Sequence, residues 1–393
     1  MDVRLKVAPL LLLLLAACAT APPRRELATF VENTISTAPF DHALWGIHIE
    51  DDDGRVLYSL NGDKLMMPAS NRKVFAAATI ANCLGFEGQL TTEVWRDGDD
   101  LVLRGDGDPS LGSWRYERTD DFDRLADALR ARGITRLRDV VADVSAFDRV
   151  TIPPAWKHGN LGSDYAAPVD ALTWGENEIP TDRAVENPAL YTATTLRDTL
   201  ILRGVEVTGV ARVNTERRAW SERLLALPSP FVGTLLRTVL KNSHNLYTEM
   251  LLKRSGDGTY ATAFGKEALF AAKEAGVPAD EFRFVDGSGL APDNLVTPRA
   301  MIAMLRWMNE PTRRAMWWSL LATPDEEGTL RRRLTPLRER LRGKTGTIAG
   351  VNALSGVIAM PNGRYRYFTV VVNHHTGDDA ISLIDAIVER AAM

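Results

Sequence analysis

The sequence predicts an α/β (α+β) protein, in which helices flank an antiparallel sheet and a small α+β domain is inserted into the main domain. Residues 44–60 alternate around the polar turn DDDGR, as a β-hairpin does. Residues 74–85 are apolar nearly all round, which is typical of a buried helix. Residues 342–375 form three strand-like runs joined by short turns, and a final helix follows. This last pattern predicts an antiparallel meander.

The composition is that of an ordinary globular protein. The chain has 393 residues, of which 45% are hydrophobic and 25% are charged, so disordered, collagen-like and coiled-coil structures are excluded. Its 47 Lys and Arg residues against 51 Asp and Glu residues give a net charge of −4. This balance gives no electrostatic reason to expect a nucleic-acid partner. Two cysteines, Cys18 and Cys83, are too few for a disulfide framework.

The first residues predict export and a lipid anchor. Arg4 and Lys6 precede an apolar run that ends at Leu15, as in a secretory signal peptide, here residues 1–17. The run is shorter than the roughly 20 residues that a membrane span needs. The tetrad Leu-Ala-Ala-Cys resembles the bacterial lipobox, so we expect Cys18 to carry the lipid. An ordinary cleavage site that happens to contain Cys is the alternative.

A lipidated Cys18 would begin a short tether, residues 18–25. Two or more acyl chains are enough for stable anchoring. We therefore expect a periplasmic protein held by lipid to a bacterial membrane, with the outer membrane favoured over the inner one.

Changes in the predicted secondary structure along the chain indicate the domain boundaries. Residues 86–165 contain short strands, the turn GDGDP and one helical stretch, and they are predicted to form the inserted small domain. The catalytic domain then consists of residues 26–85 and 166–393. The second part is mostly helical before the C-terminal meander.

Ser70 and Lys73 open the predicted buried helix. Residues three positions apart share one face of a helix, so the hydroxyl and the amine can touch. A serine is a weak nucleophile unless a base lies beside it. The pattern S-x-x-K is short and carries little information alone.

Two further motifs follow in a fixed order. Ser243, His244 and Asn245 end a helical stretch, and the motif Lys344-Thr345-Gly346 opens a strand of the meander. The order S-x-x-K, S-x-N, K-T-G resembles the penicillin-recognising serine enzymes. The sequence is most similar to the D-alanyl-D-alanine carboxypeptidases/endopeptidases among the low-molecular-mass class C penicillin-binding proteins. The similarity extends over nearly everything after Pro68 and includes the segments PASNRK, GDGDP, DVSAFD, SHNLYTEMLL, VDGSGLAPDN and GKTGTIAGVNALSG.

This resemblance implies a β-lactamase/transpeptidase-like fold and an acyl-serine mechanism. Ser70 would attack the carbonyl between two D-alanines, Lys73 would take its proton, and Ser243 would relay a proton to the leaving amine. To act near neutral pH, Lys73 needs a pKa about 3 below its ordinary value. Lys344 is the candidate neighbouring cation.

The resemblance also implies the substrate contacts. Lys344 and the strand that carries Thr345, Gly346 and Thr347 would hold the substrate carboxylate, and Asn245 would hold the peptide amide. The backbone N–H groups of Ser70 and Thr347 would form the oxyanion hole.

The resemblance bears on three further positions. Asp143 and Phe147 match a place where family members recognise the end of the peptide side chain, and a capped turn after a strand is the alternative. The middle residue of S-x-N is often Asp or Asn in the family. Here it is His244, which puts the local hydrogen bonding in question.

The expected partners are peptidoglycan stem peptides, β-lactam antibiotics as covalent inhibitors, and a membrane. We expect no cofactor and no metal, because the six histidines include no H-E-x-x-H motif. A β-lactamase or esterase of the same fold and a non-catalytic wall-binding lipoprotein are the alternatives. The balance between carboxypeptidase and endopeptidase activity stays open.

Overall fold

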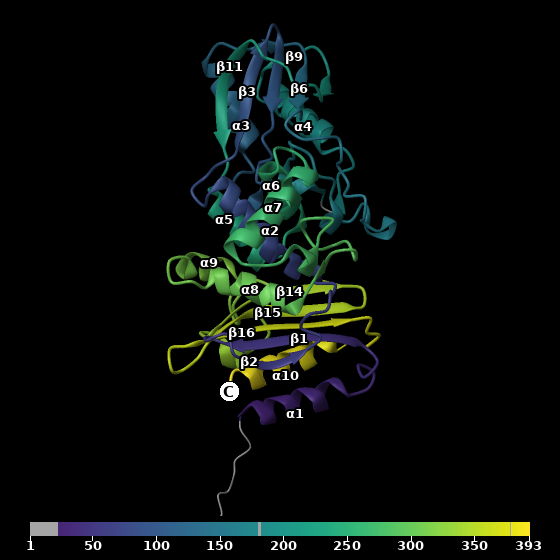
Figure 1. The fold of residues 1–393 in the computed structure, drawn as a ribbon. Coiled ribbons are helices and arrows are strands. Elements are labelled where there is room, and N and C mark those ends of the chain that lie inside the picture. Colours follow the sequence, from purple (N-terminus) through teal and green to yellow (C-terminus); the bar gives the residue numbers. More distant parts are fainter. Residues whose placement is uncertain (1–22, 180–181, 378) are drawn as a thin grey trace, which may run out of the picture.

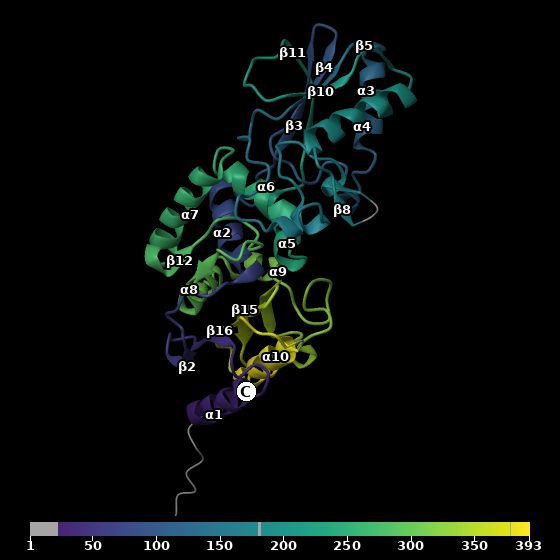
Figure 2. The same cartoon turned by 90° about the vertical axis from the view of Figure 1, so that its right-hand side faces the viewer.

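The chain was analysed in a computed structural model that describes residues 23–179, 182–377 and 379–393. The predicted signal peptide, residues 1–17, and Cys18 lie outside these ranges. The molecule is elongated, with a five-stranded sheet and the two terminal helices at one end, a second five-stranded sheet at the other, and a helical layer between them (Figures 1 and 2). Within the described ranges, no helix is both long and apolar enough to cross a bilayer.

The main sheet is antiparallel and joins both ends of the chain. Its strand order is β14-β15-β16-β1-β2, so the N-terminal hairpin pairs with the last strand of the C-terminal meander. In this register Ile47 lies opposite Val370 and Ile49 opposite Phe368. The predicted hairpin and the predicted meander are both confirmed. The strands are β1 (Leu44–Asp51), β2 (Val56–Leu60), β14 (Leu341–Ile348), β15 (Val351–Ala359) and β16 (Tyr365–Asn373).

Helices cover both faces of the main sheet. Helices α1 and α10 pack on one face and α8 packs on the other. Because both faces are covered, the central strand β15 is buried over almost its whole length. Beyond α8, helix α2 lies among α5, α6 and α7, and its residues 74–80 are fully buried, as predicted. These helices are α1 (Pro23–Ile35), α2 (Lys73–Leu84), α5 (Val232–Lys241), α6 (Asn245–Ser255), α7 (Tyr260–Glu274), α8 (Pro298–Met308), α9 (Arg314–Leu320) and α10 (Ala380–Ala391).

The second sheet is mixed and has its own core. Its strand order is β10-β6-β4-β3-β11, with parallel pairs at its β10 side and antiparallel pairs at its β11 side. Apolar side chains of α3 and α4 share a buried cluster with these strands. The elements are β3 (Thr91–Asp97), β4 (Asp100–Arg104), α3 (Asp121–Ala131), β6 (Val140–Asp143), α4 (Pro188–Leu202), β10 (Ala211–Asn214) and β11 (Glu222–Pro228).

Three short strand pairs complete the fold. One pair lies at the same end of the molecule as the second sheet, one follows α7, and one lies between β6 and α4. They are β5 (Arg136–Leu137) with β9 (Glu206–Val207), β12 (Phe282–Arg283) with β13 (Leu295–Val296), and β7 (Glu178–Ile179) with β8 (Arg183–Ala184).

The inserted unit is longer than the predicted range 86–165. Helix α4 and strands β10 and β11 follow residue 165 in the chain, yet they pack with the second sheet. The chain enters and leaves this unit side by side: the backbone N of Leu90 donates to Oγ of Ser229 over 3.0 Å, and the backbone N of Ser229 donates to the carbonyl of Leu90 over 2.8 Å. The helical pattern of residues 192–204 placed them in the wrong domain, because such a pattern does not specify which sheet a helix covers.

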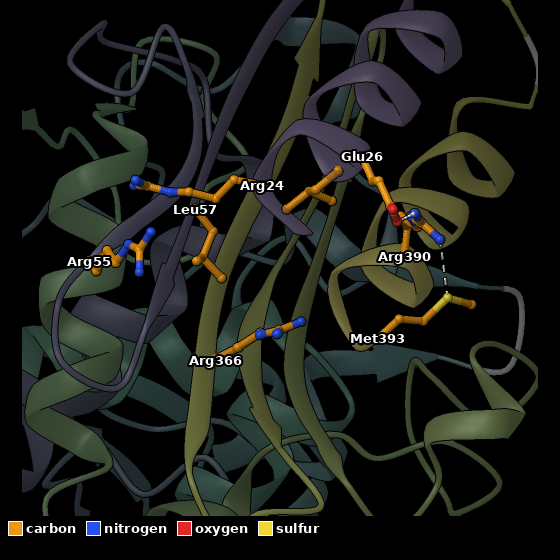
Figure 3. A pocket seen from close by; sticks show the side chains of 8 residues that line it. Arg24, Glu26, Arg55, Leu57, Arg366, Arg390 and Met393 are labelled. Carbon is orange, nitrogen blue, oxygen red and sulfur yellow. Dashed lines mark hydrogen bonds and ion pairs between the residues drawn. The ribbon is translucent and has the colours of Figure 1, made fainter. Parts of the chain in front are cut away.

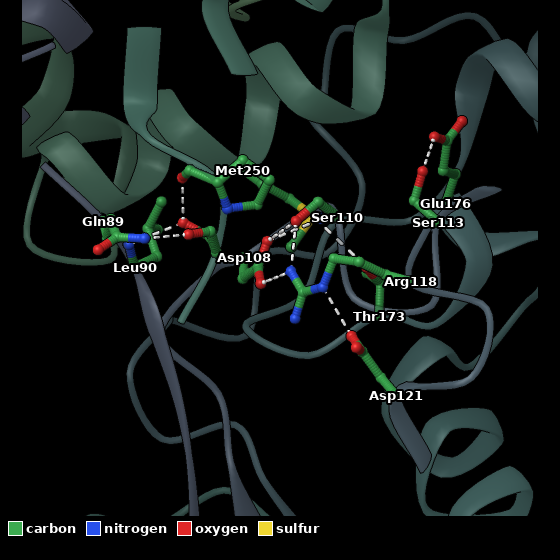
Figure 4. A network of polar contacts seen from close by, with 12 residues as sticks. Gln89, Leu90, Asp108, Ser110, Ser113, Arg118, Asp121, Thr173, Glu176 and Met250 are labelled. Atoms are coloured by element: carbon green, nitrogen blue, oxygen red, sulfur yellow. Dashed lines mark hydrogen bonds and ion pairs between the residues drawn. The ribbon is translucent and has the colours of Figure 1, made fainter. Parts of the chain in front are cut away.

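A buried polar network fixes the turn GDGDP close to this junction (Figure 4). One nitrogen of Arg118 donates to Asp108 over 2.8 Å and to Ser110 over 2.6 Å, and a second donates to Asp121 over 2.7 Å. Both carboxylates are buried and paired, which is the condition for placing charge inside a protein. The turn is therefore held rigidly between the second sheet and the helical layer.

Candidate active site

Ser70 lies in a short 3-10 turn, η1 (Ala69–Arg72), and Lys73 begins α2 directly after it. The turn runs into the helix, so the three-residue spacing brings the two side chains together. Nζ of Lys73 lies 2.9 Å from Oγ of Ser70. Lys73 is fully buried, whereas Ser70 is half-buried and lines a pocket. A serine hydroxyl that faces both a base and an open pocket is the arrangement that nucleophilic catalysis requires.

Burial lowers the pKa of Lys73 to about 7. The charges of Asp286 and Glu249 oppose this shift, and Arg72 adds to it. Lys344 was the expected cause of the low pKa of Lys73, but burial is the largest cause in the structure. At a pKa near 7, a useful share of Lys73 is a neutral amine at neutral pH and can accept the serine proton.

The loop of residues 286–291 fixes the position of the Lys73 amine. The carbonyl oxygen of Ser288 accepts a hydrogen bond from Nζ of Lys73 over 2.6 Å. The buried carboxylate of Glu249 accepts the backbone N–H of Ser288 over 2.7 Å and that of Gly287 over 2.9 Å. The buried Asp286 carboxylate accepts two more backbone N–H groups of the loop. These bonds fix the carbonyl that orients the amine, so Ser288 serves here through its backbone.

Ser243 stands between α5 and α6 in a strained conformation. Its φ is 62°, in the left-handed region that non-glycine residues seldom occupy. Such strain costs roughly 1–3 kcal/mol and clusters at functional sites. Nζ of Lys344 lies 2.8 Å from Oγ of Ser243 and donates to the carbonyl of Thr345 over 2.7 Å. Burial, together with the charge of Lys73, holds the pKa of Lys344 well below its ordinary value.

Asn245 connects the nucleophile to the pocket wall. Its Oδ1 accepts from Nζ of Lys73 over 2.7 Å, and its Nδ2 donates to the carbonyl of Tyr165 over 2.8 Å. These two bonds fix the orientation of its amide. The structure therefore brings together the five predicted central residues, which are Ser70, Lys73, Ser243, Asn245 and Lys344.

The strand that carries the K-T-G motif runs against the Ser70 turn because of Gly346. A Cβ atom at this position would lie 2.6 Å from the carbonyl oxygen of Pro68 and 3.1 Å from the backbone N of Ser70. Only glycine allows the backbones to approach this closely. Thr347, one residue further along β14, is exposed and lines the pocket, while Thr345 is buried. The proximity supports an oxyanion hole made by the N–H groups of Ser70 and Thr347, which stays a prediction.

These residues open into a pocket of about 450 Å³. Among the described residues, no group of three or more His, Cys, Asp or Glu side chains is arranged to hold a metal ion. The pocket is lined by Ser70, Lys157, Asn160, Tyr165, Ser243, Asn245, Leu290, Pro292, Thr347, Ile348 and Ala349.

Comparison with known proteins identifies the family. The model of the D-Ala-D-Ala carboxypeptidase 3 (S13) family matches residues 27–182 and 176–393. The chain belongs to this family. A D-alanyl-D-alanine carboxypeptidase from an Actinomadura strain is 27% identical, over 93% of this chain and 84% of the relative. Carboxypeptidase DacB from Mycolicibacterium smegmatis is 28% identical, over 94% of this chain and 85% of the relative.

Solved structures agree in fold. Penicillin binding protein 4 (dacB) from Haemophilus influenzae superposes with a TM-score of 0.81 at 19% identity, covering 91% of this chain and 97% of that one. A predatory endopeptidase from Bdellovibrio bacteriovorus, described as acylated by penicillin G, gives a TM-score of 0.56 at 17% identity, covering 88% and 90%. The predicted β-lactamase/transpeptidase-like fold and the predicted family are confirmed. The protein is a serine-type D-Ala-D-Ala carboxypeptidase of the S13 family.

The structure does not bring Asp143 and Phe147 to this S13 site. Asp143 ends β6, is fully buried, and accepts hydrogen bonds from Nε1 of Trp220 over 2.7 Å, from Asn214 over 3.1 Å and from the backbone N of Ser145 over 3.0 Å. Phe147 is buried in the core of the inserted unit. Neither residue lines the pocket of Ser70, so this geometry favours the capped turn over substrate recognition.

Sequence reasoning missed several residues around the S13 site. Lys157, Asn160 and Tyr165 line the pocket but come from an irregular segment with no periodic pattern or motif. His244 was noticed, but its partner was not: its Nε2 lies 3.1 Å from Oε2 of Glu176. The two residues are far apart in the chain, so only the fold reveals their contact.

Proposed function

We propose that this carboxypeptidase cleaves the D-Ala-D-Ala bond of peptidoglycan stem peptides through an acyl-enzyme on Ser70. The observation that carries the proposal is the 2.9 Å contact between Oγ of Ser70 and Nζ of Lys73, whose burial lowers its pKa to about 7. Lys73 takes the hydroxyl proton as Oγ bonds to the carbonyl carbon of the penultimate D-alanine. The C–N bond to the terminal residue then breaks. A water molecule hydrolyses the resulting ester and restores Ser70.

The second serine and the second lysine serve the leaving group and the substrate carboxylate. Oγ of Ser243, 2.8 Å from Nζ of Lys344, relays to the departing amine the proton that Lys73 took from Ser70, so that Lys73 and Ser243 both regain their starting protonation states. Lys344, with Thr345 and Thr347 on the same strand, holds the carboxylate of the substrate, and the negative charge of that carboxylate favours the protonated form of the Lys344 amine. Asn245 holds the peptide amide, and Gly346 lets the strand lie beside Ser70.

The same chemistry supports both carboxypeptidase and endopeptidase action. The leaving amine belongs to free D-alanine in the first case and to the side chain of a neighbouring stem peptide in the second. Lys157, Asn160 and Tyr165 add to the lining of the pocket of about 450 Å³, so we expect them to contact the part of the substrate that differs between the two reactions.

Penicillin is the sharpest probe of this mechanism. A related penicillin binding protein 4 is described in complex with a β-lactam, which supports the same reaction here. Penicillin should add its mass once to the purified protein, on the peptide that contains Ser70. The adduct should be absent in Ser70→Ala and strongly slowed in Lys73→Ala. The wild-type protein should also release D-alanine from a D-Ala-D-Ala pentapeptide.

Two outcomes would contradict the proposal. Rapid catalytic turnover of penicillin without D-alanine release would move the assignment to a β-lactamase. If neither an adduct nor free D-alanine formed, the remaining assignment would be a non-catalytic wall-binding lipoprotein.

We also propose that Cys18 carries a lipid and holds the mature protein in the periplasm. The support is the leader of residues 1–17 and the lipobox-like tetrad that ends at Cys18. Cys18→Ala should prevent incorporation of labelled fatty acid and should let a high-salt wash release the protein from the membrane. Incorporation of the label into this variant, or its retention on the membrane after the high-salt wash, would remove the lipid anchor.

A further inference from the structure

A second pocket lies among elements at the end of the molecule opposite the inserted unit (Figures 1 and 3). It shares no lining residue with the pocket of Ser70. It has a volume of about 370 Å³ and is formed where α1, the start of β2, β16 and the end of α10 meet. We call it the polar-end pocket. It is lined by Arg24, Glu26, Leu27, Arg55, Leu57, Arg366, Arg390 and Met393.

The polar-end pocket carries an excess of positive charge. Its lining includes four arginines and a single carboxylate, Glu26, which pairs with Arg390 over 2.9 Å. Throughout the described part of the chain, no carboxylate lies within 4.0 Å of the guanidinium groups of Arg24, Arg55 or Arg366. In Figure 3, the guanidinium groups of Arg24 and Arg55 lie on one side of the pocket and the pair of Glu26 with Arg390 lies on the other. Three arginines around one cavity, none in direct contact with a carboxylate, favour an anionic ligand.

Arg366 is the least solvated of these cations. It donates to the carbonyl of Ala391 at the end of α10 over 2.6 Å. Burial lowers its pKa, the nearby Arg340 adds to this effect, and Asp51 opposes it. A partly buried guanidinium that has a carbonyl but no carboxylate partner gains from an added anion.

The rest of the lining is apolar. Leu27 is buried, and Leu57 and Met393 add apolar surface to the same wall. Arginine forks match the geometry of phosphate oxygens. A pocket that combines such forks with apolar side chains suits a ligand with a phosphate and adjoining hydrocarbon.

The position of the polar-end pocket indicates which ligand this is. Arg24 lies in the first turn of α1 and only six positions after Cys18. Six residues span at most about 20 Å. A lipid on Cys18 would therefore keep the pocket at the membrane surface.

We propose that the polar-end pocket binds the anionic phosphate headgroup of a membrane phospholipid. The orientation at the bilayer rests on the lipid anchor proposed above, but binding of the headgroup does not. Contact at this end directs the long axis away from the membrane, because the inserted unit lies at the opposite end (Figures 1 and 2).

The test uses the Cys18→Ala protein, so that the anchor makes no contribution. Its binding is measured by co-sedimentation with vesicles of phosphatidylglycerol and phosphatidylcholine, and with vesicles of phosphatidylcholine alone. We expect binding to the anionic vesicles only, weakened by salt. The double variant Arg24→Gln/Arg55→Gln should bind roughly 30-fold more weakly.

A matched control removes the same charge elsewhere. Arg130 and Arg237 are exposed, and in the described chain neither forms an ion pair. Arg130→Gln/Arg237→Gln should keep the vesicle affinity. Equal weakening of both double variants, or equal binding to phosphatidylcholine vesicles, would overturn the headgroup site. Glycerol phosphate lacks acyl chains. If it released the protein from the vesicles at a concentration equal to that of the anionic lipid, the headgroup site would be overturned and the pocket would instead be a site for a soluble phosphate ester.

Failure of this proposal is distinct from failure of the proposed function. Both double variants should release D-alanine at the wild-type rate, because none of the four arginines contacts the Ser70 pocket. Vesicle binding without D-alanine release would overturn the peptidase mechanism and support the headgroup site.

Discussion

Oε2 of Glu176 lies 3.1 Å from Nε2 of His244, the middle residue of the S-x-N motif. Glu176 comes from the segment between β6 and α4, so this contact ties the inserted unit to the turn that carries Ser243. The same carboxylate accepts hydrogen bonds from Ser113 over 2.5 Å and from Tyr247 over 3.0 Å. One buried group therefore holds three segments of the chain next to the catalytic cluster.

This carboxylate predicts a loss of stability in acid. Burial alone would raise the pKa of Glu176, but the hydrogen bond and charge of His244, with Ser113 and Arg115, lower it to about 2. A lowered pKa contributes stability that is present above the unfolded value, near 4.5, and lost as the pH falls toward 2. Glu176→Gln should lower the free energy of unfolding by roughly 3 kcal/mol at neutral pH.

The pH dependence separates this charge effect from a packing effect. In urea unfolding, the difference between wild type and Glu176→Gln should narrow between pH 4.5 and pH 2, the window set by the two pKa values. A difference that stays constant across that window would mean that the carboxylate charge is not what stabilises the junction.

The lowered pKa of Lys73 predicts that the rate of peptide cleavage rises with pH. Its pKa is lowered to about 7, and only its neutral amine can accept the proton of Ser70. The kcat/KM for a D-Ala-D-Ala peptide should therefore increase through pH 7 and level off above it. Lys73→Arg keeps a cation that cannot lose its proton, so penicillin acylation should fall by roughly 10²–10⁴ at every pH. A wild-type profile that falls from pH 6 to pH 8 would exclude Lys73 as the base.

Local sequence patterns predicted the helices and strands of the main domain well. They did not predict contacts between residues that are far apart in the sequence. The hairpin at residues 44–60 and the buried helix after Ser70 follow from local periodicity, because one face or all faces of those segments must be apolar. The central site residues followed from three motifs and a family resemblance. The C-terminal boundary of the inserted unit was missed because it depends on the pairing of β10 with β6, in which Ala211 lies opposite Val140. No local sequence pattern encodes such a pairing. The contact of His244 with Glu176 was hidden for the same reason.

Asp143 is now expected to act on stability rather than on substrate choice. Asp143→Ala removes the acceptor of the buried Trp220 N–H and of Asn214, and this should cost roughly 1–3 kcal/mol. The kcat/KM for a stem peptide with a free side-chain amine and for a short acyl-D-Ala-D-Ala should change by the same factor. Loss confined to the amine-bearing peptide would restore Asp143 as a substrate contact.

Gly346 offers the most direct test of how closely β14 must approach the nucleophile. In Gly346→Ala, the new Cβ would lie 2.6 Å from the carbonyl of Pro68 and 3.1 Å from the backbone N of Ser70. Both neighbours are backbone atoms, so the strand or the Ser70 turn must shift by several tenths of an ångström. Overpacking of this kind costs roughly 1–3 kcal/mol. The same shift separates the N–H groups of Ser70 and Thr347, and loss of one such donor lowers the rate by roughly 10²–10³.

In Gly346→Ala, the rate of acylation by penicillin should therefore fall strongly, while the free energy of unfolding decreases only moderately. Gly265→Ala is the matched control, because Gly265 lies within α7 and a Cβ there would meet nothing within 4 Å. That variant should keep the acylation rate of the wild type and should not lower the melting temperature, because alanine stabilises a helix by roughly 0.5–1 kcal/mol over glycine. If Gly346→Ala were acylated at the wild-type rate, close contact between β14 and the Ser70 turn would not be needed to stabilise the oxyanion.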